Sequence, residues 1–431
     1  MISKYRNFIA KYLGLSIVST LNLGFVFLFQ FYAIGILGIG IESDIYMTSI
    51  VIPQYMGMVV SVVIVNIGVP YFTSKHGNDL EVVITRGLIA MTVGSILLVV
   101  LIVRFSDVIL LLLFSEIYQV RPTELSQAFS ISCAMVVFNN CSSIWIAYWY
   151  SRKNYVKVEN SALIGAVIPF ALLVFLSDEL GVVGILLLSI LRFIITLFFL
   201  FDFHRLTRKI MSRISKKMPI PRGTFSLASN VSIAKSESVI DRALIGSSEN
   251  AGLVTMHGLA YQMILVLSSI IAKTFGNETL TELSQRSADP VKYKQYFKSS
   301  MRRIFILCFL IEACIILFGE ILLLLILGIF DYEPESIRQI YSFLILLSGV
   351  LIGGSLRQVV ENLFHSSNRS RYFSLVSLIT FGCYFVLKLV AFNTFYIVGL
   401  CVAMSAYNIV DPMILYYYHT RFESRLINAK G

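Results

Sequence analysis

The feature that most constrains this chain is a succession of long apolar runs separated by short polar segments. A helix needs roughly 20 apolar residues to cross the hydrocarbon core of a bilayer. The runs lie at about 13–39, 45–70, 83–106, 124–150, 160–177 and 181–201, and then at about 224–246, 252–275, 304–327, 339–363, 373–392 and 395–418. We therefore predict an all-α polytopic membrane protein of about 12 transmembrane helices.

Composition excludes a water-soluble enzyme. Apolar residues make up 57% of the chain and charged residues 14%, whereas a soluble globular chain is about half apolar and a quarter charged. The six cysteines all fall inside apolar runs without a CxxC pair, which indicates reduced packing residues. No Walker A loop, HExxH motif, GxSxG motif or Cys/His cluster occurs in the sequence. These features favour a secondary carrier without cofactor or metal over an ATP-driven pump or an enzyme.

The net charge of +10 indicates membrane topology rather than a nucleic-acid partner. Of the 35 Lys and Arg residues, 26 fall in the two termini and in every second loop, whereas the opposite loops hold only Arg121 and Arg338. Cytoplasmic loops of membrane proteins are enriched in Lys and Arg. We therefore expect both termini to lie in the cytoplasm.

A basic segment near the midpoint divides the chain into two equal sets of runs. We expect an N-terminal six-helix lobe at 1–202, a cytoplasmic linker at 203–222 and a C-terminal six-helix lobe at 223–431. Six spans per lobe give both lobes the same orientation, so a pseudo-twofold axis is expected along the membrane normal. The linker's seven basic residues suit either the anionic inner leaflet or a solvated loop.

The seventh run is unusually polar for a membrane span. It carries Asn230, Lys235, Glu237, Asp241 and Arg242, and a charge in mid-bilayer costs about 2.5–3.5 kcal/mol even on insertion scales. At about 100° per residue, Lys235 and Arg242 share one face of a helix, and the two acids lie one turn apart on another. Three interpretations stay open: a wall of a central hydrophilic cavity, a salt-bridge network within the bundle, and a span that starts later.

Several other charged residues lie inside the runs. Arg192 and Lys388 have no partner nearby in the sequence, which favours a place in a wet cavity. Arg357 and Glu361 form an i, i+4 pair that can neutralise itself. Asp411 stands next to a proline, so it is either a carboxylate exposed at a kink or an interfacial residue.

Uncharged amides in the runs suit hydrogen bonding to sugar hydroxyls, and they equally suit helix–helix packing. The predicted substrate-cavity residues are Asn22, Gln30, Asp44, Asn139, Asn140, Arg192, Asn230, Lys235, Arg242, Arg357 and Lys388. The predicted ion-coupling residues are Asp44, Glu237, Asp241 and Glu312.

Three segments resemble the multidrug/oligosaccharidyl-lipid/polysaccharide (MOP) exporter superfamily. The stretch 40–53, GIESDIYMTSIVIP, is similar to its second-span signature, in which an acidic, an aromatic and a small residue precede Ile-Pro. The segments 240–246, IDRALIG, and 258–261, GLAY, are similar to its seventh and eighth spans. The O-antigen and polysaccharide-repeat flippases resemble the chain most, followed by the lipid II flippase. By this resemblance Asp44 matches the acidic position at the start of span two.

The resemblance implies alternating access between the two lobes. The cargo would be an undecaprenyl-pyrophosphate-linked oligosaccharide, such as an O-antigen or another surface polysaccharide repeat, carried from the inner to the outer leaflet of the bacterial cytoplasmic (inner) membrane. Membrane lipids, H⁺ or Na⁺ as coupling ion, and the polysaccharide polymerase machinery are the implied partners. No nucleic acid is expected.

Two alternatives come from the same superfamily. The lipid II branch carries arginines in span one and near the start of span eight, whereas here span one has none and the stretch around Tyr261 and Gln262 is neutral. A multidrug and toxin extruder that exports cations calls for net-negative cavity walls, and the predicted cavity is at least as basic as acidic. Outside the superfamily, a membrane scaffold or a surface-glycan polymerase also stays open; the polymerase would need a large basic outer loop, which the sequence lacks.

Overall fold

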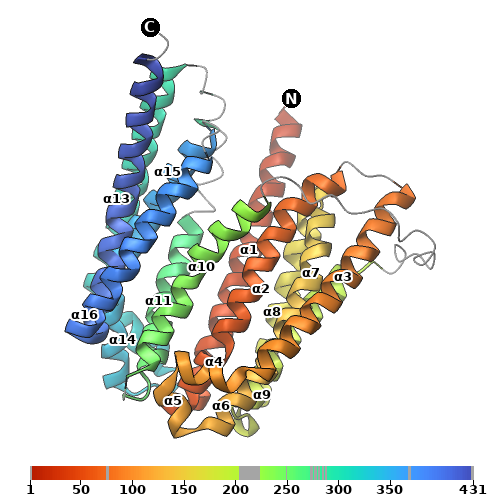
Figure 1. Ribbon diagram of the computed structural model, residues 1–431, viewed down its shortest axis with the longest axis vertical. Helices are drawn as coiled ribbons and strands as arrows, with labels where there is room; N and C mark the ends of the chain where they lie inside the picture. The colour runs from red at the N-terminus through yellow and green to blue at the C-terminus, as the bar shows by residue number, and fades with distance from the viewer. Residues whose placement is uncertain are drawn as a thin grey trace. The chain divides into compact units, whose positions relative to one another are not determined.

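The structure is a computed structural model that describes residues 2–73, 77–202, 224–248, 250–271, 275, 279, 282–283, 286, 289–366 and 370–428. Long α-helices account for nearly all of this part of the chain (Figure 1). The predicted linker at 203–222 lies outside the described residues. Contacts group the chain into two compact units, Met1–Thr255 and Met256–Gly431. The predicted all-α membrane fold is confirmed.

The described α-helices up to Gly246 belong to the first unit. They are α1 (Ile2–Leu37), α2 (Ile41–Thr73), α3 (Gly77–Arg104), α4 (Ser106–Leu113), α5 (Ser115–Val120), α6 (Pro122–Ser132), α7 (Ala134–Ser151), α8 (Tyr155–Phe175), α9 (Val182–Leu200) and α10 (Thr224–Gly246). The predicted fourth span is a broken helix, because α6 ends and α7 begins at Cys133. Pro122 starts α6, where its missing N–H costs no helical hydrogen bond. The Asn154 side chain caps α8 by accepting a hydrogen bond from the backbone N–H of Lys157.

Helix α2 lies at the centre of the first unit. It packs mainly against α7, α10 and α6, and every residue from Ser43 to Pro53 is buried. A helix covered on all sides shows no amphipathic pattern, which explains why these eleven residues read as one continuous run. Helix α10, whose residues the sequence assigns to the second lobe, packs along α2 and belongs to the first compact unit.

The described helices of the second unit follow α10 in the sequence. They are α11 (Leu253–Ile271), whose first residues belong to the first unit, α13 (Pro290–Gly328), α14 (Pro334–Leu346), α15 (Ser348–Ser366) and α16 (Ser370–Asn428). Helices α14 and α15 meet at Leu347 with a bend of 40°, and together they form the predicted tenth span.

Helix α16 is two antiparallel arms rather than one rod. Its 59 residues would reach about 88 Å if straight, against a hydrocarbon core of about 30 Å. At Tyr396 the backbone takes φ 53° and ψ −141°, which interrupts the helix. The rings of Tyr384 and Tyr407 stack with centroids 3.8 Å apart although 23 positions separate them in sequence. The chain therefore turns back between the predicted eleventh and twelfth spans.

Large apolar side chains face outward in both units, as lipid contact requires. On α3, Leu97 is 65% exposed and Val100 is 61% exposed, and on α13 Leu317 is 69% exposed. Nine helices of the described chain are long and apolar enough to cross a membrane, and the α14–α15 pair makes a tenth candidate. Two arms in α16 and the polar α10 bring the structure into agreement with about 12 spans.

Candidate functional site

The first polar centre surrounds Asp44, near the start of α2. Its carboxylate accepts hydrogen bonds from the backbone N–H of Gly252 at 2.6 Å, and from the backbone N–H and side-chain hydroxyl of Thr255 at 2.9 and 2.6 Å. Gly252 directly precedes α11 and Thr255 lies in its first turn, so neither N–H group has an acceptor within the helix. Asp44 is 2% exposed. It therefore caps α11 from a neighbouring helix, and its negative charge faces the positive end of that helix dipole.

The glycine at this cap is required by geometry. Gly252 has φ +87°, a left-handed conformation that residues with a Cβ rarely adopt, and an added Cβ would lie 2.8 Å from the side chain of Ile39. A cavity of about 260 Å³ opens beside Asp44, between α2, α5, α10 and the residues that lead into α11. Glu116 also lines it, so this cavity carries acidic rather than basic side chains.

Two predicted cations converge on α2 one turn further along. The Arg242 guanidinium of α10 donates to the carbonyl of Met47 at 2.6 Å. Tyr46 hydrogen-bonds to the side chain of Ser189, and Arg242 and Arg192 both act on it electrostatically. The Gln30 amide of α1 lies 3.1 Å from the sulfur of Met47. Residues from α1, α2, α9 and α10 thus form one polar centre, in which Gln30 and Tyr46 are buried and the two arginines are half-buried; we call it the α2 centre.

The paired asparagines of α7 serve helix packing. Asn140 is buried and donates to the Ser95 hydroxyl at 2.8 Å, which joins α7 to α3. Asn139 lies so close to Gly57 of α2 that an added Cβ there would be 2.6 Å from its amide nitrogen. The sequence leaves open whether these amides bind sugars or pack helices together, and in the structure they lie in helix–helix contacts.

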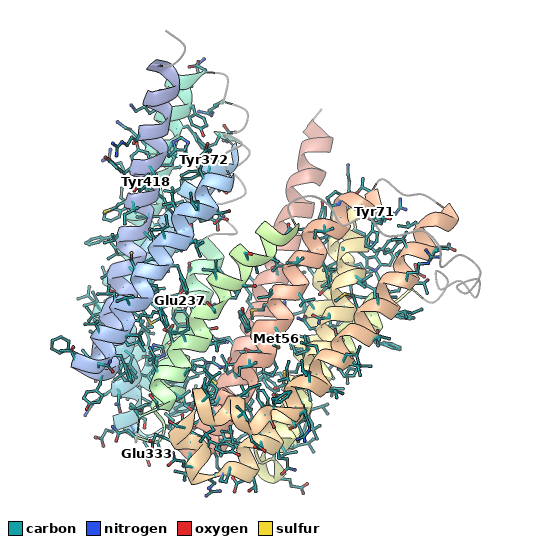
Figure 2. All side chains as sticks on the ribbon, in the orientation of Figure 1. Met56, Tyr71, Glu237, Glu333, Tyr372 and Tyr418 are labelled. Carbon is teal, nitrogen blue, oxygen red and sulfur yellow. The ribbon has the colours of Figure 1, made fainter. Side chains whose placement is uncertain are left out.

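The remaining predicted residues of the first unit are spread out. Lys235 is exposed and Glu237 is half-buried on α10 (Figure 2), whereas Asp241 is 2% exposed. Asn22 is half-buried, and its carbonyl oxygen accepts no hydrogen bond within the described residues. The side chain of Asn230 lies outside the described residues.

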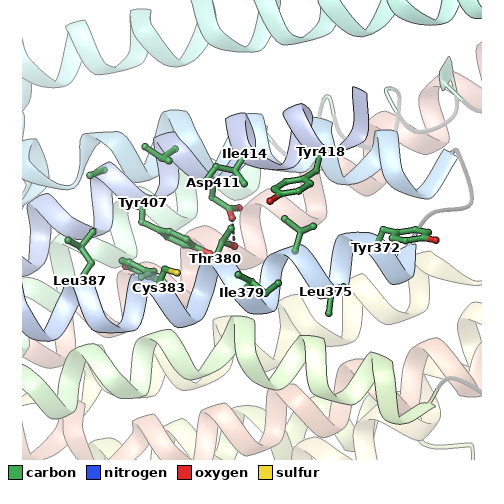
Figure 3. Close-up of a pocket in the computed structure, with 14 residues that line it drawn as sticks. Tyr372, Leu375, Ile379, Thr380, Cys383, Leu387, Tyr407, Asp411, Ile414 and Tyr418 are labelled. Atoms are coloured by element: carbon green, nitrogen blue, oxygen red, sulfur yellow. Dashed lines mark hydrogen bonds between the residues drawn. The ribbon is translucent and has the colours of Figure 1, made fainter. Parts of the chain in front are cut away.

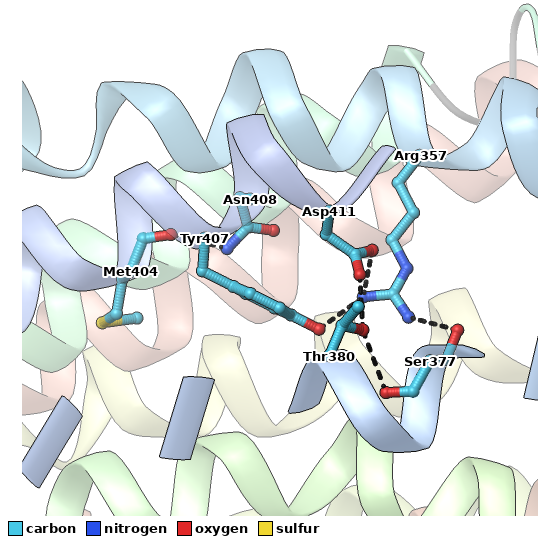
Figure 4. A network of polar contacts seen from close by, with 7 residues as sticks. All are labelled: Arg357, Ser377, Thr380, Met404, Tyr407, Asn408 and Asp411. Carbon is cyan, nitrogen blue, oxygen red and sulfur yellow. Dashed lines mark hydrogen bonds and ion pairs between the residues drawn. The ribbon is translucent and has the colours of Figure 1, made fainter. Parts of the chain in front are cut away.

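The second polar centre lies where α15 meets the two arms of α16 (Figure 4). The Arg357 guanidinium is 3.3 Å from the Asp411 carboxylate, which is fully buried. Thr380 donates to the other carboxylate oxygen at 2.8 Å. Arg357 also reaches the hydroxyls of Tyr407 and Ser377 at 3.5 Å each. We call this cluster the α16 centre.

A chain of aromatic contacts extends the α16 centre along the hairpin. Tyr407 stacks on Tyr384, and the Lys388 ammonium lies 4.3 Å from the centre of the Tyr384 ring. Lys388 is 1% exposed, so its charge is shielded from lipid by this cation–π contact. Two predicted cavity residues, Arg357 and Lys388, are thereby linked through two tyrosines that the sequence analysis did not single out.

A groove of about 520 Å³ lies between the arms of α16 (Figure 3). Its walls are mostly apolar, with Leu375, Ile379 and Leu387 on one arm and Val410 on the other. Thr380, Asp411 and several tyrosines supply its polar groups. The groove therefore joins an apolar surface to the buried ion pair of the α16 centre.

The residues next to Asp411 in the sequence do not indicate its ion-pair partner. The neighbouring Pro412 suggests a kink or an interface, whereas Asp411 pairs with Arg357, 54 residues earlier in the chain. Glu361, the i+4 neighbour of Arg357, attracts it electrostatically. A buried cation and a buried carboxylate on different spans are a signal for pairing, since neither tolerates lipid alone.

Solved structures define the class of protein. The fold is similar to the lipid II flippase MurJ in an inward closed conformation, with TM-score 0.78 and 14% identity over 95% of this chain and 87% of that one. It is similar to an inward-facing multidrug resistance MATE family transporter, with TM-score 0.71 and 12% identity over 96% and 100%. A MOP superfamily transporter from Pyrococcus furiosus gives TM-score 0.62 and 14% identity over 96% and 95%. This is the transporter fold of the MOP superfamily, as the sequence predicts.

A sequence-family match identifies the chain more specifically than the likeness of its fold. The family model described as lipid II flippase MurJ matches residues 34–429, and the chain belongs to this family. No curated protein sequence matches the chain. The protein is therefore a multi-pass membrane transporter of a flippase family rather than an enzyme.

Proposed function

We propose that this protein moves a polyprenyl-pyrophosphate-linked saccharide across the membrane by alternating access, with its apolar tail left in the bilayer. The carrying observation is that cationic side chains are held inside the helix bundles: Arg192 and Arg242 at the α2 centre, and Arg357 and Lys388 at the α16 centre. A guanidinium in a low-dielectric site binds phosphate oxygens through two parallel hydrogen bonds. Membership of a flippase family supports the same conclusion.

The surroundings of these cations suit a saccharide headgroup. Tyr46 and Gln30 flank the α2 centre, and Tyr407, Thr380 and Ser377 flank the α16 centre. Hydroxyl and amide groups hydrogen-bond to sugars without adding charge. The bonds that now join these groups to one another would be exchanged for bonds to the headgroup.

The saccharide we favour is a surface polysaccharide repeat unit, such as an O-antigen unit. This preference rests on α1, which carries no arginine within its apolar run, and on the neutral stretch of α11 around Tyr261 and Gln262. Lipid II is the second candidate, because the matching family model is that of the lipid II flippase. Export of cationic drugs is disfavoured by the basic character of both centres.

Complementation separates the two cargoes. The chain is expressed in one bacterium depleted of its lipid II flippase and in another that lacks its polysaccharide-repeat flippase. We expect restored surface glycan in the second strain and continued lysis in the first. Rescue of the first strain alone identifies lipid II as cargo, and rescue of neither strain by a well-expressed, membrane-inserted protein refutes the proposal.

Substitution tests the role of the α2 centre. Arg242→Gln removes a half-buried guanidinium that contacts α2, and the matched control Lys235→Gln removes an exposed cation from the same helix. We expect a loss of export of about tenfold or more for the first variant, the size of effect expected when one charge-assisted contact is removed, and near-normal export for the second. Equal export by both variants at equal protein level would remove Arg242 from the substrate site.

Further proposals concern topology and partners. Both termini are placed in the cytoplasm by the loop charges. Polysaccharide polymerase machinery is the expected recipient of the flipped unit. Labelling of cysteines introduced near each terminus by a membrane-impermeant thiol reagent checks the topology, and labelling from outside in intact cells would contradict it.

A further inference from the structure

A buried carboxylate in the middle of α13 takes no part in either polar centre. Glu312 is 4% exposed, and neither of its carboxylate oxygens has a hydrogen-bond partner within the described residues. Buried polar atoms in proteins are nearly always hydrogen-bonded, so two unsatisfied oxygens on one carboxylate require an explanation. An ionised carboxylate in this position is strongly unfavourable, whereas a protonated one is neutral.

The position of Glu312 is set by the single buried stripe of α13. Ile304, Cys308, Gly319 and Leu323 share this stripe, while Phe309, Leu310 and Leu317 on the other faces are exposed to the surroundings of the bundle. The basic end of α13 carries Arg302 and Arg303. At about 1.5 Å per residue, Glu312 lies about 14 Å from Arg303 along the helix.

Within the described residues, the charged groups of the helices packed against α13 are directed elsewhere than to Glu312. Helices α15 and α14 make most of these contacts, and α16 adds the stack of Tyr416 on Phe297 near the basic end. On α15, Arg357 is directed to Asp411, and Glu361 acts on Arg357. On α14, Tyr341 donates to the carbonyl of Ile316, and Arg338 pairs with Glu320 near the far end of α13.

The Cys308 thiol lies one turn before Glu312 and is influenced electrostatically by it. It lies beside Ser355 of α15, whose hydroxyl has no hydrogen-bond partner within the described residues. A metal cation of the Na⁺ or Ca²⁺ kind needs several hard oxygen ligands, and one carboxylate with a thiol does not supply them. A single proton satisfies the carboxyl group without any further ligand.

Polar side chains run from Glu312 toward only one end of α13. Helices α13 and α15 are antiparallel, because Tyr293 donates to the carbonyl of Leu363 while Cys308 meets Ser355. The buried polar residues of the two helices on the side of the basic end are Ser300, Cys308, Ser355 and Asn362. Beyond Glu312 in the other direction the buried stripe is apolar, with Gly319, Leu323 and Leu327.

We infer that Glu312 is a proton-binding site that exchanges with the aqueous phase at the basic end of α13, and that its protonation and deprotonation accompany the transport cycle. The protonation follows from the contacts of Glu312 alone. Its coupling to transport rests on the proposed function. Glu312 is one of the four acidic residues predicted from the sequence to couple an ion to transport, and we assign it a proton rather than Na⁺.

Infrared spectroscopy of the full-length protein in lipid tests the protonation directly. A protonated carboxylic acid in an apolar site gives a carbonyl stretching band that a carboxylate lacks and that shifts on exchange into D₂O. We expect this band at neutral pH in the unmodified protein, its loss in Glu312→Gln, and its retention in the control Glu320→Gln, which removes an exposed, paired acid from the same helix. Identical spectra for the unmodified protein and Glu312→Gln would overturn the inference, as would loss of the band on addition of Na⁺.

A second measurement separates coupling from structure. In proteoliposomes, a pH gradient is imposed and the rate of appearance of the lipid-linked saccharide in the opposite leaflet is recorded. We expect the rate to depend on the gradient in the unmodified protein and in Glu320→Gln, and to lose that dependence in Glu312→Gln. Unchanged dependence in Glu312→Gln overturns the coupling. Absence of flipping in the unmodified protein refutes the proposed function instead, while the infrared band still decides the protonation.

Discussion

Removal of the Asp44 carboxylate is expected to destabilise the first unit strongly. The carboxylate accepts three hydrogen bonds from the start of α11 and is 2% exposed. A hydrogen bond to a charged group contributes about 1.5–3 kcal/mol, so the three together amount to roughly 4–9 kcal/mol before any offset. Removal also relieves the cost of burying the charge, and the expected net loss for Asp44→Ala is about 3–5 kcal/mol.

The measurement is the free energy of unfolding in mixed micelles titrated with a denaturing detergent. Thr255→Val removes one of the three donors and leaves the two backbone N–H groups in place, so we expect a loss of about 1.5–3 kcal/mol. Glu42→Ala, an exposed acid two positions before Asp44, is the matched control and is expected to stay within about 0.5 kcal/mol.

A double-mutant cycle isolates the contact. If the Asp44–Thr255 bond stabilises the fold as argued, Asp44→Ala and Thr255→Val together cost less than the sum of the single variants, with a coupling of at least about 1 kcal/mol. An Asp44→Ala variant as stable as the control would refute the argument that this carboxylate holds α11 in place.

Three further predictions concern other parts of the chain. Asp411→Ala leaves the guanidinium of Arg357, whose side chain is 26% exposed, without its ion-pair partner, so we expect a loss of about 2–4 kcal/mol in the same titration, and a smaller loss when Arg357→Met is added. In Gly353→Ala the added methyl overlaps the backbone of α16, so we expect a loss of about 1–3 kcal/mol in the free energy of unfolding. In Gly382→Ala the methyl meets open space, so we expect no loss or a gain. A larger loss for Gly382→Ala than for Gly353→Ala would contradict the packing. Asp289 caps α13, and the hydrogen bond that its carboxylate accepts from the backbone of the first helical turn holds the pKa of this carboxyl below its usual value. Because the folded pKa is depressed, the stabilisation is complete above the unfolded pKa of about 3.9 and is lost only below it. An effect of Asp289→Ala on the free energy of unfolding that varies between pH 5 and 8 would contradict the assignment.

The sequence predicted the architecture because lipid imposes a strict pattern on it. Apolar runs, loop charges and the second-span signature are local in sequence, and they located the spans and the superfamily without any tertiary information. The break in the fourth span at Cys133 and the reversal at Tyr396 were not predictable in detail, since both depend on backbone geometry rather than on apolar content.

The candidate site was predictable in composition but not in pairing. That Arg242, Arg192 and Gln30 line a substrate cavity stays a prediction; the structure places all three beside Tyr46 and Met47 of α2. The role of Asp44 as a cap for α11 joins residues more than 200 positions apart, which no local pattern reports.

In the second unit, too, pairing between distant residues was not predictable from local sequence. The ion pair of Arg357 with Asp411 requires the turn in α16 to bring the last span beside α15. Local spacing favoured Glu361 as the partner, because an i, i+4 neighbour is visible in sequence and a residue on another helix is not.

The most direct test of the account is the sidedness of a lipid-linked saccharide in proteoliposomes that contain only this protein. A polyprenyl-pyrophosphate-linked repeat unit is incorporated, and its exposure in the outer leaflet is followed with a membrane-impermeant lectin or glycosidase. We expect exposure to rise well above the rate in protein-free vesicles, and to fall about tenfold in Arg242→Gln, the size of loss expected for one charge-assisted contact. A rate equal to that of protein-free vesicles, for lipid II as well as for the repeat unit, would contradict the central claim.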